Sequence, residues 1–249
     1  MNNFKINENE RIDDLQLDGL RLIQNPDWFC FGVDAVLLSD FALKSIKKNN
    51  SVLDLCCGNG IVPILLSAKS PAAHITGIEI QPPVADLAAR SVKMNGLDEK
   101  IDIVCGDLRE AVKIFGKCSF DTISCNPPYK EAHGGLKNSD DIVTAARHEI
   151  FCTLRDVIEV SEQLLKPYGK LVLIHRPERL ADILCIMREM RTEPKRIRFV
   201  HPSCGKTATM ILVEGAKHGN PKLFLEPPLY IHDENGNYTE EINRIYGRI

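Results

Sequence analysis

The chain has 249 residues, of which 44% are hydrophobic and 26% charged, proportions that are ordinary for one globular domain or one domain with an extension. Its formal net charge is −3, so the field of the whole molecule does not attract nucleic acid, and such a partner would need a local basic patch. Nine cysteines are present, and none forms a Cys-x-x-Cys pair. This pattern indicates neither a disulfide framework nor a zinc site, and we expect no bound metal.

The N-terminus is polar. Residues Met1 to Arg11 lack the apolar core of a signal peptide, and no later run is long enough to span a bilayer. We therefore expect a cytoplasmic protein with no membrane partner. The sequence leaves the oligomeric state open and slightly favours a monomer.

Residues 1–44 are interpreted as an N-terminal extension, a hairpin plus a helix, that packs on a main domain of residues 45–249. Alternating apolar residues from Leu15 to Gln24, with Asp18-Gly19 between them, predict the hairpin. Farther along, Asp34 is placed to cap the helix. Periodicity leaves two interpretations of this helix equally open: it covers a sheet edge, or it lines a ligand pocket.

From Ser51 onward strands alternate with helices, which is typical of a parallel sheet with crossover helices. The first expected strand, residues 52–56, leads through a turn that contains Gly58 and Gly60 into a helix from Ile61. Glycines in such a turn let the backbone approach a ligand closely and point free N–H groups at it.

Two further strands end in acidic residues. The strand at 74–80 carries Glu79, roughly 20 residues beyond the glycines, which is the spacing at which an acid meets a ribose diol. The strand at 101–105 leads to Asp107, which could bind an adenine amine. Because ligands bind at the carboxyl ends of parallel strands, Asp54, Glu79 and Asp107 are expected at one rim of the sheet.

The fourth strand, Asp121 to Cys125, stops at Asn126-Pro127-Pro128-Tyr129. A proline cannot continue a central ladder, so this tetrapeptide is expected at the lip of the same crevice. The prolines contribute no backbone donors, which leaves a rigid corner of acceptors beside an aromatic ring. Such a corner suits a planar NH2 group. Taken alone it also fits a structural turn, but its convergence with the other strand ends favours a site.

Basic residues in the second half of the chain are the candidates for contacts with phosphate. Lys130 begins a segment that reads as a mobile loop beside the site. Arg176 follows the fifth expected strand. The cluster that contains Arg196 and Arg198 is the best candidate for a phosphate-binding patch, although such clusters usually form a solvated surface.

The remaining elements are expected to complete the sheet. A helix from Arg147 to Leu165 carries His148 near its start, and we interpret this histidine as a capping or structural residue. Residues 198–200 and 208–213 are expected to pair as antiparallel strands. The tail at 223–231 is expected to add a strand interrupted by prolines.

In this order and spacing, the motifs resemble those of class I S-adenosylmethionine-dependent methyltransferases that act on a planar amide or amine nitrogen. Three further segments, Phe31 to Leu38, Ala146 to Glu149 and Lys206 to Gly215, resemble the bacterial tRNA adenine-N6 methyltransferases. Known members of that group modify the adenosine just 3′ of the anticodon in valine tRNA. The resemblance covers nearly the whole chain. It implies a Rossmann-like α/β fold with a mostly parallel, seven-stranded sheet and helices on both faces.

The resemblance also implies roles for individual residues, with RNA, above all tRNA, as the partner. Asn126 and the carbonyl of Pro127 would accept hydrogen bonds from the target nitrogen, and Tyr129 would stack on an unstacked or flipped base. Cys56 departs from the pattern, since such enzymes usually have glycine there. The cofactor, S-adenosylmethionine, would be bound by Asp54, Cys56, Gly58, Gly60, Glu79, Ile80, Asp107, Leu108 and Asn126.

Three alternatives stay open. A protein glutamine-N5 methyltransferase would use the same corner, but such enzymes usually carry a longer helical domain than the 44 residues that precede the main domain here. A DNA adenine methyltransferase would need a target-recognition domain, for which the chain has no room. A nucleotide-binding oxidoreductase, or a non-catalytic nucleotide-binding module, would fit Glu79 but would leave the Asn-Pro-Pro-Tyr motif without a role.

Overall fold

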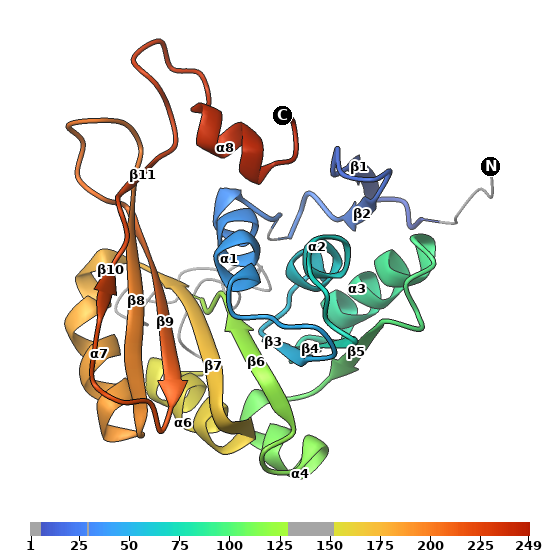
Figure 1. Cartoon of the computed structure of the whole chain (residues 1–249). Helices are drawn as coiled ribbons and strands as arrows, with labels where there is room; N and C mark the ends of the chain where they lie inside the picture. The colour runs from blue at the N-terminus through green and yellow to red at the C-terminus, as the bar shows by residue number, and fades with distance from the viewer. Residues whose placement is uncertain (1–5, 29, 129–151) are drawn as a thin grey trace, which may run out of the picture.

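The computed structural model describes residues 6–28, 30–128 and 152–249 (Figure 1). A hairpin and a helix precede a long stretch in which strands and helices alternate, as the sequence predicts. Before residue 129 the elements are β1 (Arg11–Asp14), β2 (Arg21–Gln24), α1 (Val33–Leu43), β3 (Ser51–Leu55), α2 (Ile61–Lys69), β4 (His74–Glu79), α3 (Pro82–Met94), β5 (Ile101–Cys105), η1 (Leu108–Glu110), α4 (Ala111–Phe115) and β6 (Phe120–Cys125). After residue 151 they are α6 (Leu154–Leu164), β7 (Leu165–His175), η2 (Pro177–Arg179), α7 (Leu180–Glu189), β8 (Thr192–His201), β9 (Met210–Lys217), β10 (Phe224–Leu225), β11 (Leu229–Tyr230) and α8 (Glu240–Ile245).

One sheet forms the centre of the described structure, in the order β10-β8-β9-β7-β6-β3-β4-β5, with β11 also paired to β8. Strand β9 runs antiparallel to β7 and β8, and the other neighbours are parallel. The mostly parallel α/β class is therefore confirmed. The seven expected strands are β3 to β9, and the tail adds β10 and β11, so the sheet has nine strands among the described residues. Pro227 and Pro228 separate these two short strands, since proline cannot continue a ladder.

Both faces of the sheet are buried under helices. Along β7, Leu171 and Leu173 belong to one apolar cluster, whereas Val172 and Ile174 belong to the other. Such alternation between two cores is what a strand covered on both faces requires. Figure 1 shows α1, α2 and α3 on one side of the sheet and α4, α6 and α7 on the other.

The N-terminal hairpin is present with its second strand as expected, but its first strand, β1, lies before the predicted one. Residues 15–20 form the connection, whereas the sequence pattern predicts a strand from Leu15. Leu15 and Leu20 point into the core and are each 9% exposed. The apolar pattern in this segment therefore comes from a buried loop and not from a strand. Asp18 and Gly19 have φ of +49° and +72°, as expected for the Asp-Gly turn of a hairpin.

The hairpin is attached to α3. The side chain of Asn95, at the end of α3, accepts from the backbone N–H of Arg21 at 2.9 Å and donates to its carbonyl at 2.7 Å. The backbone N–H of Ile23 donates to Ser91 Oγ at 3.0 Å. Gly96, with φ of +64°, ends the helix in the left-handed conformation that the Asn-Gly pair predicts. These three hydrogen bonds therefore hold β2 against the C-terminal part of α3.

The second half of the chain follows the predicted order with longer strands. Strands β8 and β9 pair antiparallel, with Phe199 opposite Ile211, as the sequence predicts. Helix α6 begins after Thr153, whose side chain forms a reciprocal capping box with Asp156. The loop expected at 130–141 and the helix start at 147–149, including His148, lie outside the described residues. Among the residues that are described, no helix is both long and apolar enough to cross a membrane.

Candidate cofactor and catalytic site

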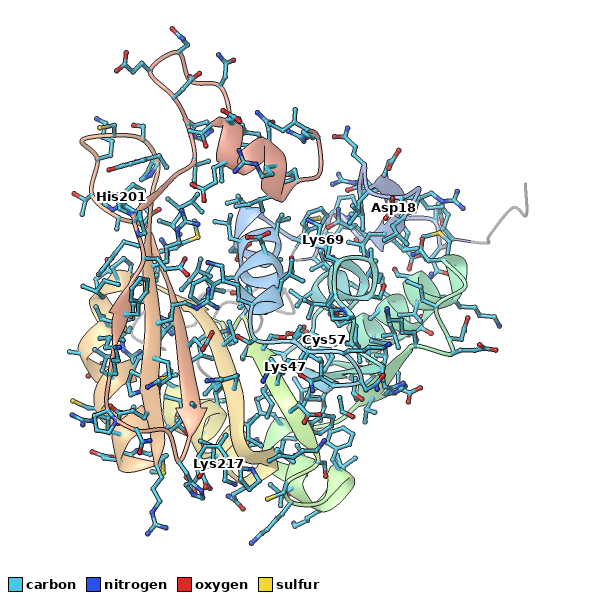
Figure 2. All side chains as sticks on the ribbon, viewed as in Figure 1. Asp18, Lys47, Cys57, Lys69, His201 and Lys217 are labelled. Atoms are coloured by element: carbon cyan, nitrogen blue, oxygen red, sulfur yellow. The ribbon has the colours of Figure 1, made fainter. Side chains whose placement is uncertain are left out.

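A cavity of about 320 Å³ lies at the carboxyl ends of β3, β4, β5 and β6. Asp54, Glu79, Asp107 and Asn126 all line it, so the structure brings together the strand ends that the sequence predicts to meet. The volume is within the range of sites for small ligands. Cys57, which is labelled in Figure 2, lies in the turn between β3 and α2 and also lines the cavity.

The turn after β3 bends through three residues in the left-handed region. The φ angles are +58° at Cys56, +55° at Gly58 and +85° at Gly60. A Cβ on Gly60 would lie 3.2 Å from the Cβ of Ala88, so the glycine also permits close approach of α3. The left-handed conformation explains why glycine is the usual residue at position 56, and cysteine there occupies a region that side chains rarely adopt.

The thiol of Cys56 points into a group of cysteines beside the cavity. Its Sγ lies 4.0 Å from Sγ of Cys152, which also lines the cavity. A hydrogen bond with Cys125, together with burial, raises the pKa of the Cys56 thiol well above its usual range. Cys56 is therefore a neutral, apolar part of the wall rather than a nucleophile.

Two carboxylates reach the cavity in contrasting surroundings. Glu79 is 6% exposed and accepts from the backbone N–H groups of Gly58 at 3.1 Å and Gln81 at 3.0 Å. Burial raises the pKa of Glu79. Asp107 accepts from Arg109 Nε at 2.9 Å, and this hydrogen bond lowers the pKa of Asp107. The cavity is also lined by Ile80 and Leu108, each of which directly follows one of these carboxylates in the sequence.

Asp54 is a third carboxyl group on the cavity wall, and it is 1% exposed. Ser124 in the neighbouring strand donates its hydroxyl to Asp54 Oδ1 at 2.6 Å. Burial raises the pKa of Asp54 to about 8, against the lowering effect of Ser124. The side chain therefore belongs to the buried frame beneath the glycine turn.

Asn126 follows β6 directly, and Pro127 and Pro128 extend the cavity wall from it. The side-chain amide Nδ2 of Asn126 donates to Oδ2 of Asp34 at 3.0 Å. Asp34 lies in the first turn of α1 and also lines the cavity, so of the two interpretations of this helix the pocket-lining one is correct. Asp34 is not the helix cap; Gly32 occupies that position. Tyr129 and Lys130 lie outside the described residues.

The N-terminal segment contributes much of the cavity wall, which sequence reasoning does not predict. Gln24 is 3% exposed, and its Oε1 accepts from the backbone N–H of Phe31 at 3.1 Å and from Asn59 Nδ2 at 3.3 Å. Gln24, Trp28 and Phe31 all line the cavity. The sequence alone places none of these three residues at a site; for this part of the chain it leaves open only that the helix after Asp34 lines a pocket.

The structure separates the candidate phosphate-binding arginines. Arg176 lines the cavity. Arg196 is 8% exposed and pairs with Glu214 at 2.7 Å and Glu226 at 3.0 Å, so the expectation of a solvent-facing phosphate contact there is wrong. Arg198 pairs with Glu241 at 2.7 Å, and its side chain is 13% exposed. The basic cluster is misleading because both arginines pair with acidic residues from other parts of the chain.

The family model described as "Methyltransferase small domain" matches residues 31–190. A protein of Porphyromonas gingivalis named tRNA1(Val) (adenine(37)-N6)-methyltransferase is 30% identical over 222 residues, which cover 86% of each chain. This chain belongs to that methyltransferase family. A protein of Vibrio cholerae with the same name is 28% identical over 207 residues and covers 83% of this chain and 82% of its own. Membership of the family decides against an oxidoreductase and against a non-catalytic module.

Solved structures agree on the fold of the family. A predicted O-methyltransferase of Agrobacterium tumefaciens aligns over 86% of this chain and 95% of its own, with a TM-score of 0.69 at 21% identity. The tRNA m1G37 methyltransferase of Methanocaldococcus jannaschii aligns over 86% of this chain and 56% of its own, with a TM-score of 0.60 at 16% identity. At these identities the likeness establishes the Rossmann-like class I methyltransferase fold.

Proposed function

We propose that this protein transfers a methyl group from S-adenosylmethionine to N6 of an adenine in tRNA, next to the anticodon. The position of Asn126-Pro127-Pro128 carries the proposal, because these residues open on the same cavity as Glu79 and Asp107. The name shared by the relatives, which specifies adenine 37 of tRNA1(Val), supports the choice of acceptor.

The cavity fits the cofactor in size and in chemistry. Glu79 is a buried carboxylate at a strand end, which suits the two hydroxyls of a ribose. Asp107 offers acceptor oxygens for the amine of an adenine ring. A Cβ on Gly58 would meet no atom within 4 Å, so this glycine leaves open space at the turn where the methionine part would lie. Asp54, Cys56, Gly60, Ile80 and Leu108 complete the proposed binding residues.

When bound, S-adenosylmethionine supplies a methyl group on a sulfonium centre, which is already a good leaving group. The protein then has to position the acceptor and polarise it. The lone pair of an exocyclic adenine nitrogen is delocalised into the ring, which makes that nitrogen a poor nucleophile. Hydrogen bonds from its two hydrogens to Asn126 Oδ1 and to the Pro127 carbonyl would favour a tetrahedral nitrogen. Those bonds strengthen as positive charge develops, so they stabilise the transition state more than the ground state.

The remaining roles concern the RNA. Tyr129 would stack on the flipped base, as the resemblance implies. Lys130 is a further candidate for a contact with the RNA backbone. Arg176 is the cationic side chain among the described residues of the cavity wall, and we propose it as a phosphate contact at the entrance. Arg196 has no such role in the proposal, since its guanidinium is buried between Glu214 and Glu226.

The test is methyl transfer from labelled S-adenosylmethionine to total tRNA, rRNA, DNA and protein from a strain that lacks the gene. We expect label in tRNA, recovered as N6-methyladenosine after nucleoside analysis. A valine tRNA transcript with adenine next to the anticodon should accept label. The matched transcript with guanine at that position, which has no N6 amine, should not.

Two results would overturn the proposal. Label in protein as N5-methylglutamine would transfer the function to a protein glutamine methyltransferase, whose planar amide fits the same corner. Equal labelling of the adenine and guanine transcripts would leave the enzyme as a tRNA methyltransferase but would reject the nucleotide next to the anticodon as its target.

A further inference from the structure

Asp34 and Asn126 lie 92 residues apart in sequence and meet on the cavity wall. Nδ2 of Asn126 donates to Oδ2 of Asp34 at 3.0 Å. The other oxygen of Asp34, Oδ1, accepts from the backbone N–H of Ala35 at 3.0 Å. Both carboxylate oxygens are therefore engaged, one by the start of α1 and the other by the amide that the proposed reaction uses.

The chemistry of the two groups makes this contact directional. An ionised carboxylate only accepts hydrogen bonds, whereas a side-chain amide has a donor end and an acceptor end. A flipped Asn126 would place Oδ1 against Oδ2 of Asp34, two acceptors with no proton between them. The carboxylate therefore selects the orientation in which Nδ2 faces Asp34 and Oδ1 faces away from it.

We propose that Asp34 is a positioning residue that fixes the orientation of the Asn126 amide, so that Oδ1 is presented to the target NH2 group. This inference rests on the proposed function, in which Asn126 Oδ1 accepts from the amine. Asp34 acts through Asn126 in the way that an orienting carboxylate sets the direction of a catalytic side chain in other enzymes.

The residue before α1 supports this assignment. Gly32 has an extended backbone, with φ of −114° and ψ of −171°, which other residues can adopt. A Cβ there, however, would lie 2.9 Å from Oδ1 of Asp34. Glycine at this position thus leaves space for the carboxylate, and a Gly32→Ala substitution would displace Asp34 without removing it.

The first test is the isosteric substitution Asp34→Asn, assayed by methyl transfer to tRNA. The new amide can donate or accept, so it no longer selects one orientation of Asn126. We expect kcat to fall about 10- to 100-fold, as for other residues that orient a reacting group, while KM for the cofactor stays close to the wild-type value. Asp34→Glu, which restores an acceptor-only group, should recover part of the loss. Asp40→Asn makes the same chemical change on the same helix, outside the cavity, and serves as the control.

A double-mutant cycle separates orientation of Asn126 from a direct effect of the negative charge. If Asp34 acts through Asn126, Asp34→Asn should cause no further loss in the Asn126→Ala background. Additive losses, or an unchanged kcat for Asp34→Asn alone, would overturn the inference. Gly32→Ala should lower kcat in the same direction as Asp34→Asn.

A measurement without turnover keeps the inference testable if the acceptor is not tRNA. In a nitrogen–proton correlation spectrum of the protein, the side-chain NH2 pair that disappears in Asn126→Ala belongs to Asn126. We expect this pair to shift in Asp34→Asn and to stay in place in Asp40→Asn. An unmoved pair would reject the Asp34 contact. The expected shift in Asp34→Asn, together with a wild-type protein that does not methylate tRNA, would reject only the proposed function.

Discussion

The two halves of the sheet use their charged and polar residues in opposite ways. In the parallel half, Glu79 and Asn126 stand where β4 and β6 end, and both face the cavity. In the antiparallel half, Arg196 lies within β8 and pairs across the ladder with Glu214 of β9. Lys217, at the far end of β9 in Figure 2, likewise donates to the backbone carbonyl of Leu165 at 3.0 Å. The comparison teaches that position at the carboxyl edge of the parallel strands, more than charge, separates a ligand group from a structural one, since Lys217 ends an antiparallel strand.

The largest expected effect comes from the structural half. Arg196→Met removes a guanidinium that is held by Glu214, by Glu226 and by the ring of Phe41, whose centroid lies 3.7 Å away. Because the two glutamates would remain buried without this partner, we expect the free energy of unfolding to fall by about 3–5 kcal/mol. Chemical denaturation measures the loss, and RNA affinity of the folded protein should be unchanged.

Arg198→Met is the matched variant for this prediction. Its partner Glu241 has a side chain that is 43% exposed, so the acid left behind stays hydrated. We expect a loss of at most about 1 kcal/mol, as for exposed ion pairs. If Arg196→Met instead kept full stability and weakened RNA binding, the two halves of the sheet would not differ as stated.

In the cavity half, Asn126→Ala tests the acceptor corner itself. Removal of one preorganised hydrogen-bonding group from a reacting centre typically lowers kcat about 100- to 1,000-fold. We expect a loss of this size in methyl transfer, with cofactor affinity by calorimetry nearly unchanged. Asn243→Ala, in α8 and away from the cavity, is the control. A large loss of cofactor affinity would show that Asn126 acts in binding rather than in transfer.

Glu79→Gln tests whether the strand-end carboxylate of the parallel half binds the cofactor. The substitution keeps the shape of the side chain but removes the charge that accepts from Gly58 and Gln81. Loss of hydrogen bonds to a charged group costs about 1.5–3 kcal/mol, so we expect the Kd for S-adenosylmethionine to rise about 10- to 100-fold. Glu99→Gln, on an exposed loop, should bind as the wild type does. Equal affinities of both variants would remove Glu79 from the binding site.

The parallel half was predictable because its signals are local. A buried strand that stops at a polar residue, such as Glu79 or Asn126, can be identified within a few residues of sequence. The expectation that these residues meet at one site then follows from the rule that ligands bind at the carboxyl edge of a parallel sheet. The structure confirms that Asp54, Glu79, Asp107 and Asn126 share one cavity.

The other features depend on contacts between distant segments. Asp34 reads as a helix cap from its neighbours, and only the folded chain brings it to Asn126. Gln24 is the last residue of the short strand β2. It lines the cavity because β2 packs against α3. The sequence around Arg196 predicts a surface charge, and only the folded chain shows that Glu226 of the tail pairs with it. Periodicity describes which face of an element is buried, and it cannot specify the partner that covers that face.

The last expected effect is a pH dependence of stability that arises in the frame beneath the cavity. Burial raises the pKa of Asp54 to about 8, from 3.8 for an unperturbed carboxyl group. Between these values the folded protein holds a proton that the unfolded chain has released. Unfolding then releases a proton, so the contribution of Asp54 to stability is complete below pH 3.8 and is lost as the pH rises towards 8. The slope that one such group can impose is at most about 1.4 kcal/mol per pH unit.

Asp54→Asn should therefore flatten the fall in stability between pH 5 and pH 8, because asparagine carries no titrating proton and can still accept from Ser124. The measurement is the free energy of unfolding by denaturant at several pH values across that interval. A residual slope should remain, since burial also raises the pKa of Glu79. Asp98→Asn, on an exposed turn, should leave the wild-type slope intact. If Asp54→Asn kept the full slope, Asp54 would be ionised in the folded protein, and burial beneath the glycine turn would not hold its proton.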